Sequence, residues 1–282
     1  MDSTEESEMI KILLQYQHGF FISKVLLTAS ELGVFDLLLE SGESQTSTMI
    51  AERLNTSPIG MERLLETCVG LKLLRMERKG DKDYFGNTKF ANLFLAKSSP
   101  KSQYNYLKLF SEIGYSSFQY LTDAVREGKN QLESIHGPST KDFFQAMYSS
   151  EEKIEKYFSA LGNTWSLFGR EVVSAFDLSH FPTIYDLGGG SGVLAKECTS
   201  LYPNSTVTIF DLPQVVERAN KHFVASKEHR ITFQEGNFFK DPVLKLTCTF
   251  WLESCTSGMR KVCAVVYKTS QSLQTRWWSV DS

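Results

Sequence analysis

The stretch Thr183-Ile184-Tyr185-Asp186-Leu187-Gly188-Gly189-Gly190-Ser191-Gly192 decides the fold of this chain. An apolar run ends in an acid and opens into a glycine-rich turn, and a helix-like stretch, Val193 to Leu201, follows. Glycine lets a backbone turn sharply and approach a ligand closely, because no side chain stands in the way. The pattern predicts a strand, a ligand-binding turn and a helix. Asp186 falls at the carboxyl end of the strand, where open α/β sheets bind ligands.

A second acid follows at the spacing typical of a ribose-binding carboxylate. The apolar run Thr206 to Phe210 ends in Asp211, about twenty residues after the glycines. The turn is neither the usual GxGxxG pattern nor a phosphate-binding loop with its Lys-Ser/Thr. We therefore expect a nucleoside with a neutral or positive tail rather than a pyrophosphate. The alternative, a glycine turn without a ligand, is weakened by the two acids.

Several segments together resemble the small-molecule O-methyltransferases that use S-adenosylmethionine. In the C-terminal half these are DLGGGSG, then FDLP at Phe210 to Pro213, then FQEGNFFKD at Phe233 to Asp241. In the N-terminal half they are GFFISKVLLTASELGVFDLLL and GMERLLETCVGLKLL. The set, which covers Ile10 to Pro242, is similar to the enzymes that methylate N-acetylserotonin to melatonin. The resemblance implies S-adenosyl-L-methionine as cofactor, a hydroxyindole or another phenol as substrate, and a homodimer.

The resemblance also implies a role for individual residues. Asp211 should accept both ribose hydroxyls, and Gly188 and Gly190 should let the backbone approach the methionine portion. Gly236-Asn237-Phe238 matches a Gly-Asp-Phe stretch whose acid bonds the adenine amine, so Asn237 keeps an acceptor but loses the charge. Aromatic residues suit a sulfonium cation and a flat indole. The expected cofactor residues are Tyr148, Trp165, Asp186, Gly188, Gly190, Asp211, Gly236, Asn237 and Phe238.

Two of these assignments have plainer alternatives. Residues 100–180 are rich in aromatic side chains, most of which we expect to be ordinary core. Tyr148 and Trp165 are singled out only because they stand at the family's matching places. The segment Gly236 to Phe238 can likewise be read as a polar loop without a ligand.

The N-terminal region follows the order of a winged helix-turn-helix. Met49 to Leu54 and Met61 to Leu74 read as two helices around a Ser-Pro start, and a hairpin pattern with Gly80 follows. DNA binding is the alternative function for such a unit. The second helix, however, carries Glu62 and Glu66 against Arg63, which is unfavourable beside phosphates. In the resembling family this region forms the dimer interface. The runs Phe20-Phe21, Val25-Leu26-Leu27 and Leu37-Leu38-Leu39 also exceed what we expect one small helical layer to bury alone.

Composition limits the remaining classes of function. The net charge of the 282 residues is −3, which does not favour nucleic acid, and the five cysteines show no spacing typical of disulfides or zinc. The acidic, polar start and the lack of a long apolar run predict a cytoplasmic protein without a membrane partner. We expect no metal.

Residues 243–282 depart from the family pattern. The family continues with a strand, an Arg, a Leu-His-x-Trp that holds the catalytic base, and a Lys-Pro-Gly-Gly-Gly turn. This chain has no His after His229, so no catalytic residue can be assigned.

The genetic code suggests why. Read one base out of frame, the codons for Leu244 to Met259 permit Pro-Glu-Ala-Asp-Leu-Tyr-Ile-Leu-Ala-Arg-Ile-Leu-His-Glu-Trp. A further shift across Gln271 to Val280 permits Lys-Ala-Cys-Lys-Pro-Gly-Gly-Gly-Val-Leu. Some codons force the match, as where Trp277 requires Gly. The tail is therefore interpreted as frameshifted and this chain as inactive.

These observations predict an α/β chain. A winged-helix-like dimerisation domain (1–95) leads into a helical linker and substrate-pocket region (96–180). A Rossmann-like methyltransferase half-domain (181–242), truncated after its third strand, precedes the frameshifted tail (243–282). The truncation should leave one edge of the sheet unpaired. Three functions stay open: an O-methyltransferase, a non-catalytic dimerising fragment, and a winged-helix DNA-binding ligand sensor.

Overall fold

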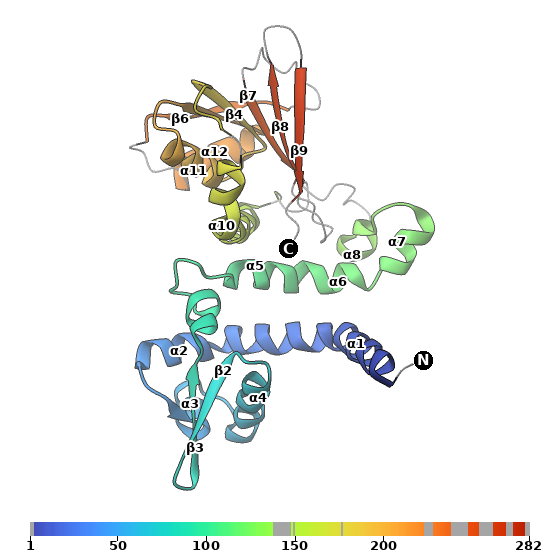
Figure 1. The fold of residues 1–282 in the computed structure, drawn as a ribbon, viewed down its shortest axis with the longest axis vertical. Helices are drawn as coiled ribbons and strands as arrows, with labels where there is room; N and C mark the ends of the chain where they lie inside the picture. The colour runs from blue at the N-terminus through green and yellow to red at the C-terminus, as the bar shows by residue number, and fades with distance from the viewer. Residues whose placement is uncertain are drawn as a thin grey trace. The chain divides into compact units, whose positions relative to one another are not determined.

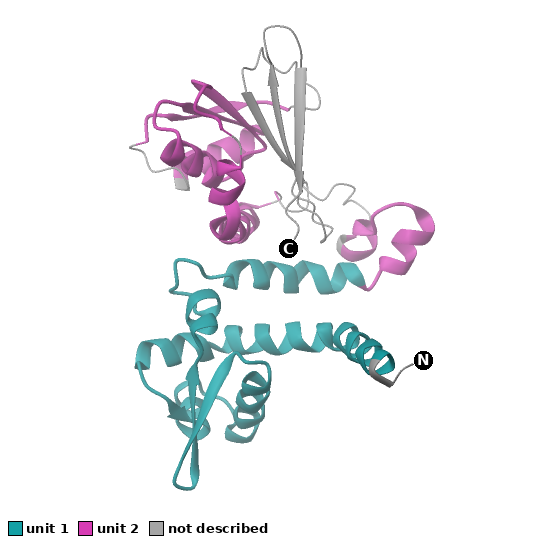
Figure 2. Ribbon diagram, in the orientation of Figure 1, with its two compact units in different colours: residues 1–118 teal, residues 119–282 magenta. Residues whose placement is uncertain are grey.

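The chain forms two compact units in a computed structural model. The structure describes residues 3–137, 148, 150–175, 177–222, 228–237, 248–253, 262–268 and 273–279. For the last three ranges it describes the backbone only, which forms strands. Unit 1 is Met1–Phe118 and unit 2 is Gln119–Ser282 (Figures 1 and 2).

Unit 1 is mainly helical, with one small antiparallel sheet. Its elements are α1 (Ser3–Leu32), α2 (Val34–Ser41), β1 (Gln45–Thr46), α3 (Ser47–Arg53), α4 (Pro58–Gly70), β2 (Leu74–Lys79), β3 (Lys82–Asn87), the π-helical η1 (Ala91–Leu95), α5 (Tyr104–Leu109), the π-helical η2 (Phe110–Gly114) and α6 (Tyr115–Phe118). The strand order is β1-β3-β2.

The predicted helix, turn, helix and hairpin are confirmed in unit 1. Ser57 begins α4 by accepting a hydrogen bond from the Gly60 amide at 3.4 Å, and Pro58 stands in the first turn, where no amide partner is needed. Strands β2 and β3 pair out to Lys79 opposite Lys82, and Gly80 supplies the positive φ of 61° that this tight turn requires.

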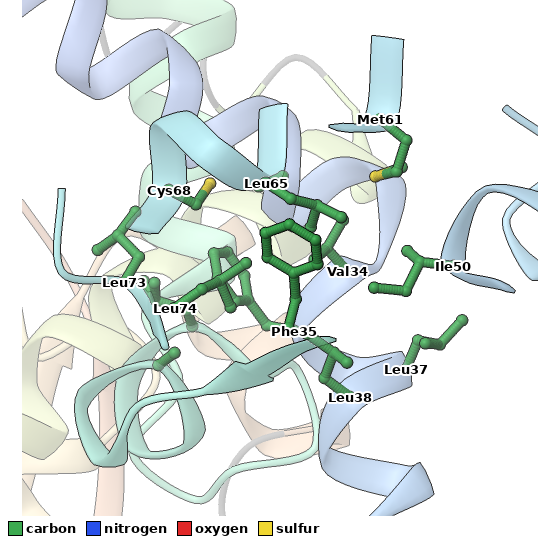
Figure 3. Packing of buried hydrophobic residues seen from close by; sticks show 14 of the residues in the cluster. Val34, Phe35, Leu37, Leu38, Ile50, Met61, Leu65, Cys68, Leu73 and Leu74 are labelled. Atoms are coloured by element: carbon green, nitrogen blue, oxygen red, sulfur yellow. The ribbon is translucent and has the colours of Figure 1, made fainter. Parts of the chain in front are cut away.

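The core of unit 1 joins α2, α3, α4 and the sheet around Phe35. Figure 3 shows Phe35 between Val34, Leu65 and Leu74, with Leu37 and Leu38 on the same helix. Leu37 and Leu38 are buried, and Val25, Leu26 and Leu39 pack against the same cluster. We expected the runs Phe20-Phe21, Val25-Leu26-Leu27 and Leu37-Leu38-Leu39 to exceed what one helical layer can bury alone. Unit 1 buries Leu27, Leu37 and Leu38 by itself and covers Val25, Leu26 and Leu39 in part, whereas Phe20 and Phe21 stay exposed.

Helix α1 keeps a series of exposed apolar residues between Met9 and Ile22. Met9, Leu13, Tyr16 and Phe20 are 44%, 55%, 78% and 56% exposed. Their spacing of three or four residues places them on one face of the helix. We call these four residues the α1 stripe.

Unit 2 contains the sheet that the sequence around the glycine turn predicts. Its helices are α7 (Leu121–Glu127), α8 (Leu132–His136), α10 (Glu151–Ser174), α11 (Val193–Leu201) and α12 (Pro213–His222). Its strands are β4 (Thr183–Leu187), β5 (Thr206–Asp211), β6 (Ile231–Glu235), β7 (Cys248–Glu253), β8 (Val262–Lys268) and β9 (Leu273–Ser279), in the order β6-β5-β4-β7-β8-β9.

Strands β4, β5 and β6 form the predicted parallel half-sheet. Asp186 of β4 pairs with Ile209 of β5, and Asp211 of β5 pairs with Glu235 of β6. Their apolar residues meet α10 and α11 in a core that includes Val173, Ile184 and Leu194. Helix α11 thus follows the glycine turn as the sequence predicts.

The tail adds strands to this half-sheet instead of leaving the edge of β4 unpaired. β7 runs parallel to β4, and β8 and β9 continue the sheet antiparallel. We expected an open edge after the third strand. The sequence Cys248-Thr249-Phe250-Trp251-Leu252 favours a strand in this frame too, because aromatic and β-branched residues suit strands.

Other features bear on function class. Within the part of the chain that the structure describes, no helix has the length and apolar character to cross a membrane. In the same part, no three His, Cys, Asp or Glu side chains are grouped as metal ligands. Cys68 and Cys198 are buried and form no disulfide, and burial raises the pKa of Cys68 to about 12.

Candidate active site

The glycine turn after β4 has the backbone that only glycine adopts easily. Gly188, Gly190 and Gly192 have φ of 71°, 51° and 75°. The Gly188 amide donates to the Phe210 carbonyl at 2.8 Å, which ties the turn to the end of β5. Gly192 is the N-cap residue of α11 and has no side chain with which to cap it, so the first amides of the helix need other acceptors. The predicted glycines therefore line one bend of backbone between two strand ends.

Asp211 lies at the end of β5, beside this turn. Its Oδ2 accepts a hydrogen bond from the Gly190 amide at 2.9 Å, and its Oδ1 accepts one from the Leu212 amide at 2.7 Å. Burial raises the pKa of Asp211 to about 6, and the two amides partly oppose that rise. Each oxygen keeps a lone pair for a further donor.

Asp186 lies next to Asp211 at the end of β4, and it is 4% exposed. Among the described residues its Oδ2 is buried without a hydrogen-bond partner. Burial, and then the negative charge of Asp211, raise the pKa of Asp186 to about 7. A Cβ at Gly189 would come 2.5 Å from Oδ2 of Asp186, so the carboxyl group occupies the space that a side chain at Gly189 would need.

Tyr148 belongs to the same site. Its ring centroid lies 6.0 Å from that of Tyr157 and 6.4 Å from that of Phe158. Burial raises the pKa of Tyr148, and the charge of Asp211 raises it further. Phe158 in turn reaches the glycine turn, because its Cε1 would lie 3.5 Å from a Cβ on Gly190.

Trp165 lies further along α10, against the core. Its ring is 4.9 Å from that of Phe168, and it packs on the cluster that contains Leu194. The structure therefore brings Tyr148 near Asp211 and places Trp165 further along α10, where it packs against α11.

The third loop of the site is partly described. The Gly236 amide donates to the Asp211 carbonyl at 2.9 Å, which brings Gly236 to the end of β5, and Asn237 follows it. Phe238 lies outside the described residues. The structure thus gathers Asp186, Gly188, Gly190, Asp211 and Gly236 around three neighbouring strand ends.

The sequence did not point to three residues of this site. Tyr157 and Phe158 read as core residues of a long helix, and only the fold places Phe158 beside Gly190. The sequence analysis gave Gly189 no role. The signal that could have identified it is its position three residues after Asp186, because a tight turn brings two such residues into contact.

A nucleoside cofactor fits these residues. The partnerless Oδ2 of Asp186 is an acceptor without a donor, and Asp211 has lone pairs to spare. The positive-φ glycines leave the turn without side chains, and aromatic rings stand beside it.

The fold and the site define an O-methyltransferase. The sequence model of an O-methyltransferase domain matches residues 118–250, and that of an O-methyltransferase dimerisation domain matches residues 14–97. Acetylserotonin O-methyltransferase of Gallus gallus is 54% identical over 86% of this chain and 70% of its own length. The human enzyme is 45% identical over 85% of this chain and 70% of its own length. The chain belongs to the acetylserotonin O-methyltransferase family.

The solved structures agree on the fold. The crystal structure of human N-acetylserotonin methyltransferase in complex with SAM superposes with a TM-score of 0.78 at 45% identity. The match covers 86% of this chain and 70% of the human one. A second structure, LaPhzM, matches with a TM-score of 0.71 at 25% identity, over 83% of this chain and 68% of its own.

Proposed function

We propose that this site binds S-adenosyl-L-methionine, and that the reaction of its lineage is methylation of the hydroxyl of N-acetylserotonin to give melatonin. The observation that carries the proposal is the hydrogen bond between the Gly190 amide and Asp211, because it joins the glycine turn to an acid placed for a ribose. The 54% identity to the chicken enzyme supports the hydroxyindole over other phenols as substrate.

Each part of the site has a proposed task. Asp211 accepts the ribose hydroxyls, and the bare backbone at Gly188 and Gly190 admits the methionine portion. Gly236, Asn237 and Phe238 meet the adenine. Tyr148 and Trp165 supply aromatic surface, which attracts a sulfonium cation. Asp186 offers its unpaired oxygen to a donor on the same ligand. The bound cofactor supplies an electrophilic methyl group.

No residue of this chain is assigned to take the acceptor's proton. Methyl transfer to a phenol needs a positioned base near neutral pH. The expected Leu-His-x-Trp histidine is absent from residues 243–282, and the O-methyltransferase model stops matching at residue 250. We therefore propose that this chain binds the cofactor but does not turn it over, as a non-catalytic subunit of its family.

We also propose that residues 1–95 pair two subunits as a homodimer. The dimerisation model covers residues 14–97, and the α1 stripe is apolar surface that unit 1 does not bury. Residues 96–180 then contribute to the substrate pocket, residues 181–242 hold the cofactor, and residues 243–282 are the frameshifted tail. We do not favour DNA binding. Glu62 and Glu66 are exposed on α4 beside Arg63, and their negative charges would repel phosphates.

Titration calorimetry with S-adenosyl-L-methionine tests the proposal directly. We expect one saturable site per chain for this ligand and none for NAD or ATP. A radiolabelled methyl-transfer assay with N-acetylserotonin on the same sample should show no product. Failure to bind S-adenosyl-L-methionine would refute the cofactor assignment, and turnover would refute the non-catalytic one.

A further inference from the structure

One arginine ties the helix that follows Asp211 to the start of α10. Arg218 lies on α12, which begins two residues after Asp211. Its Nη2 lies 2.9 Å from Oε2 of Glu151 and 3.4 Å from Oε1 of Glu155. The two acids are one turn apart in α10, so they face the same neighbour. A single guanidinium group therefore connects two helices that are far apart in the sequence.

The burial of this contact is unequal. The Arg218 side chain is 11% exposed, whereas Glu151 and Glu155 are 75% and 46% exposed. A nearly buried guanidinium needs its carboxylate partners, because its charge has lost most of its water. By contrast, the ion pair between Glu152 and Lys156 joins two exposed residues of α10 itself, 3.1 Å apart.

The start of α10 carries the aromatic side of the cofactor site. Tyr148 precedes the helix by three residues, and it packs against Tyr157 and Phe158 in the second and third turns. Phe158 approaches Gly190, and the charge of Asp211 acts on Tyr148. The position of these rings relative to the two acids depends on how α10 is held against α12.

We propose that Arg218 is a positioning residue for cofactor binding: by pairing with Glu151 and Glu155 it holds Tyr148, Tyr157 and Phe158 against the glycine turn and Asp211. The inference rests on the proposed function, since it deepens the role of the same site. Arg218 acts through the first two turns of α10, where Glu151 and Glu155 lie.

Hydrogen exchange on the full chain without ligand tests the contact itself. Arg218→Gln should raise amide exchange in residues 151–160 by about tenfold and leave β4 and β5 unchanged. Glu152→Gln is the matched control, because it removes a charge from the same helix without unlinking α12. Unchanged exchange in residues 151–160 of Arg218→Gln would overturn the inference, whether or not the chain binds a cofactor.

Calorimetry with S-adenosyl-L-methionine tests the consequence. Arg218→Gln should weaken binding by about tenfold, and Arg218→Lys, which keeps the charge, should recover part of the loss. Arg230→Gln is a second control: Arg230 pairs with Glu228 and holds the Thr199 carbonyl at 2.8 Å, away from the glycine turn. Equal affinity in Arg218→Gln and the unchanged chain would overturn the inference. If the unchanged chain itself does not bind, the proposed function is refuted instead.

Discussion

The Gly190 amide donates a hydrogen bond of 2.9 Å to Oδ2 of Asp211, so the turn after β4 is held by the acid at the end of β5. Together with the bond from the Gly188 amide to the Phe210 carbonyl, this contact holds the two strand ends at which a ligand would bind. The carboxylate has two tasks in consequence: it orders the glycine turn, and its remaining lone pairs face the proposed ribose.

Replacing Asp211 should separate these two tasks. Asp211→Ala removes every acceptor and should weaken S-adenosyl-L-methionine binding at least about a hundredfold, because charged hydrogen bonds to two hydroxyls are lost. Asp211→Asn keeps an oxygen for the Gly190 amide but loses the charge, and we expect an intermediate affinity. Titration calorimetry measures both. Wild-type affinity in Asp211→Ala would sink the assignment.

Gly189 should resist substitution for a different reason from its neighbours. Gly189→Ala places a methyl group 2.5 Å from Oδ2 of Asp186, and we expect a loss of about 1–3 kcal/mol in unfolding free energy from this overpacking. Gly169→Ala on α10 is the control, since its Cβ would meet its nearest atom at an ordinary 3.7 Å. The measurement is urea unfolding of both variants, and an equal midpoint for the two would contradict the expectation.

Asp186 should make the stability of unit 2 depend on pH. Its pKa rises from 3.8 to about 7 on folding because burial disfavours the charged form. The folded state then binds the proton more tightly than the unfolded state. The stability that Asp186 contributes is therefore greatest below about pH 4 and is lost as the pH rises towards 7. For this group the slope should be on the order of 1.4 kcal/mol per pH unit at most.

Asp186→Asn tests that dependence, because the amide resembles the protonated acid in shape. Urea midpoints of the variant should vary less between pH 4 and 7 than those of the unchanged chain. Asp177→Asn serves as control: Asp177 is exposed, and its pKa is lowered by hydrogen bonds from Ser179, so its removal should not flatten the profile. The idea fails if Asp186→Asn keeps the full slope.

Much of the site was readable from the sequence because its geometry is local. The run from Asp186 to Gly192 dictates a strand end and a turn, and the parallel pairing of β4 with β5 then brings Asp211 beside it. The role of Phe158 was not readable, since it depends on how α10 packs over the sheet. Arg218 was hidden for the same reason, because its partners Glu151 and Glu155 lie more than sixty residues earlier in the sequence.

The N-terminal unit shows the same limit in its packing. The sequence predicted an excess of apolar surface, but it did not say which residues would keep it. Leu37 and Leu38 became core once α2 packed on the sheet, and the α1 stripe remained outside. Periodicity identifies an apolar face, whereas the choice between core and interface depends on tertiary contacts.

The α1 stripe should control self-association. Leu13→Glu combined with Tyr16→Glu introduces two charges into the proposed interface and should shift the chain from dimer to monomer at micromolar concentration in sedimentation equilibrium. Val125→Glu is the control, since Val125 is 76% exposed on α7 in unit 2. A monomer before any substitution, or a dimer that survives the double substitution, would argue against this interface.

The tail decides whether the site can act. Read in the shifted frames, the codons for Leu244 to Val280 permit the family's Leu-His-x-Trp and Lys-Pro-Gly-Gly-Gly segments, while the chain as given has neither. Restoring the frames should supply a histidine for the acceptor's proton and yield methyl transfer to N-acetylserotonin. The present chain should yield none, because no other base is assigned in it.

Replacing the restored histidine by Gln is the control, and it should lower the rate about 10²–10⁴-fold, as expected for loss of a general base. A radiolabelled methyl-transfer assay compares the three chains. If the chain as given is as active as the restored one, residues 243–282 are a functional element in their own right and the frameshift account is wrong.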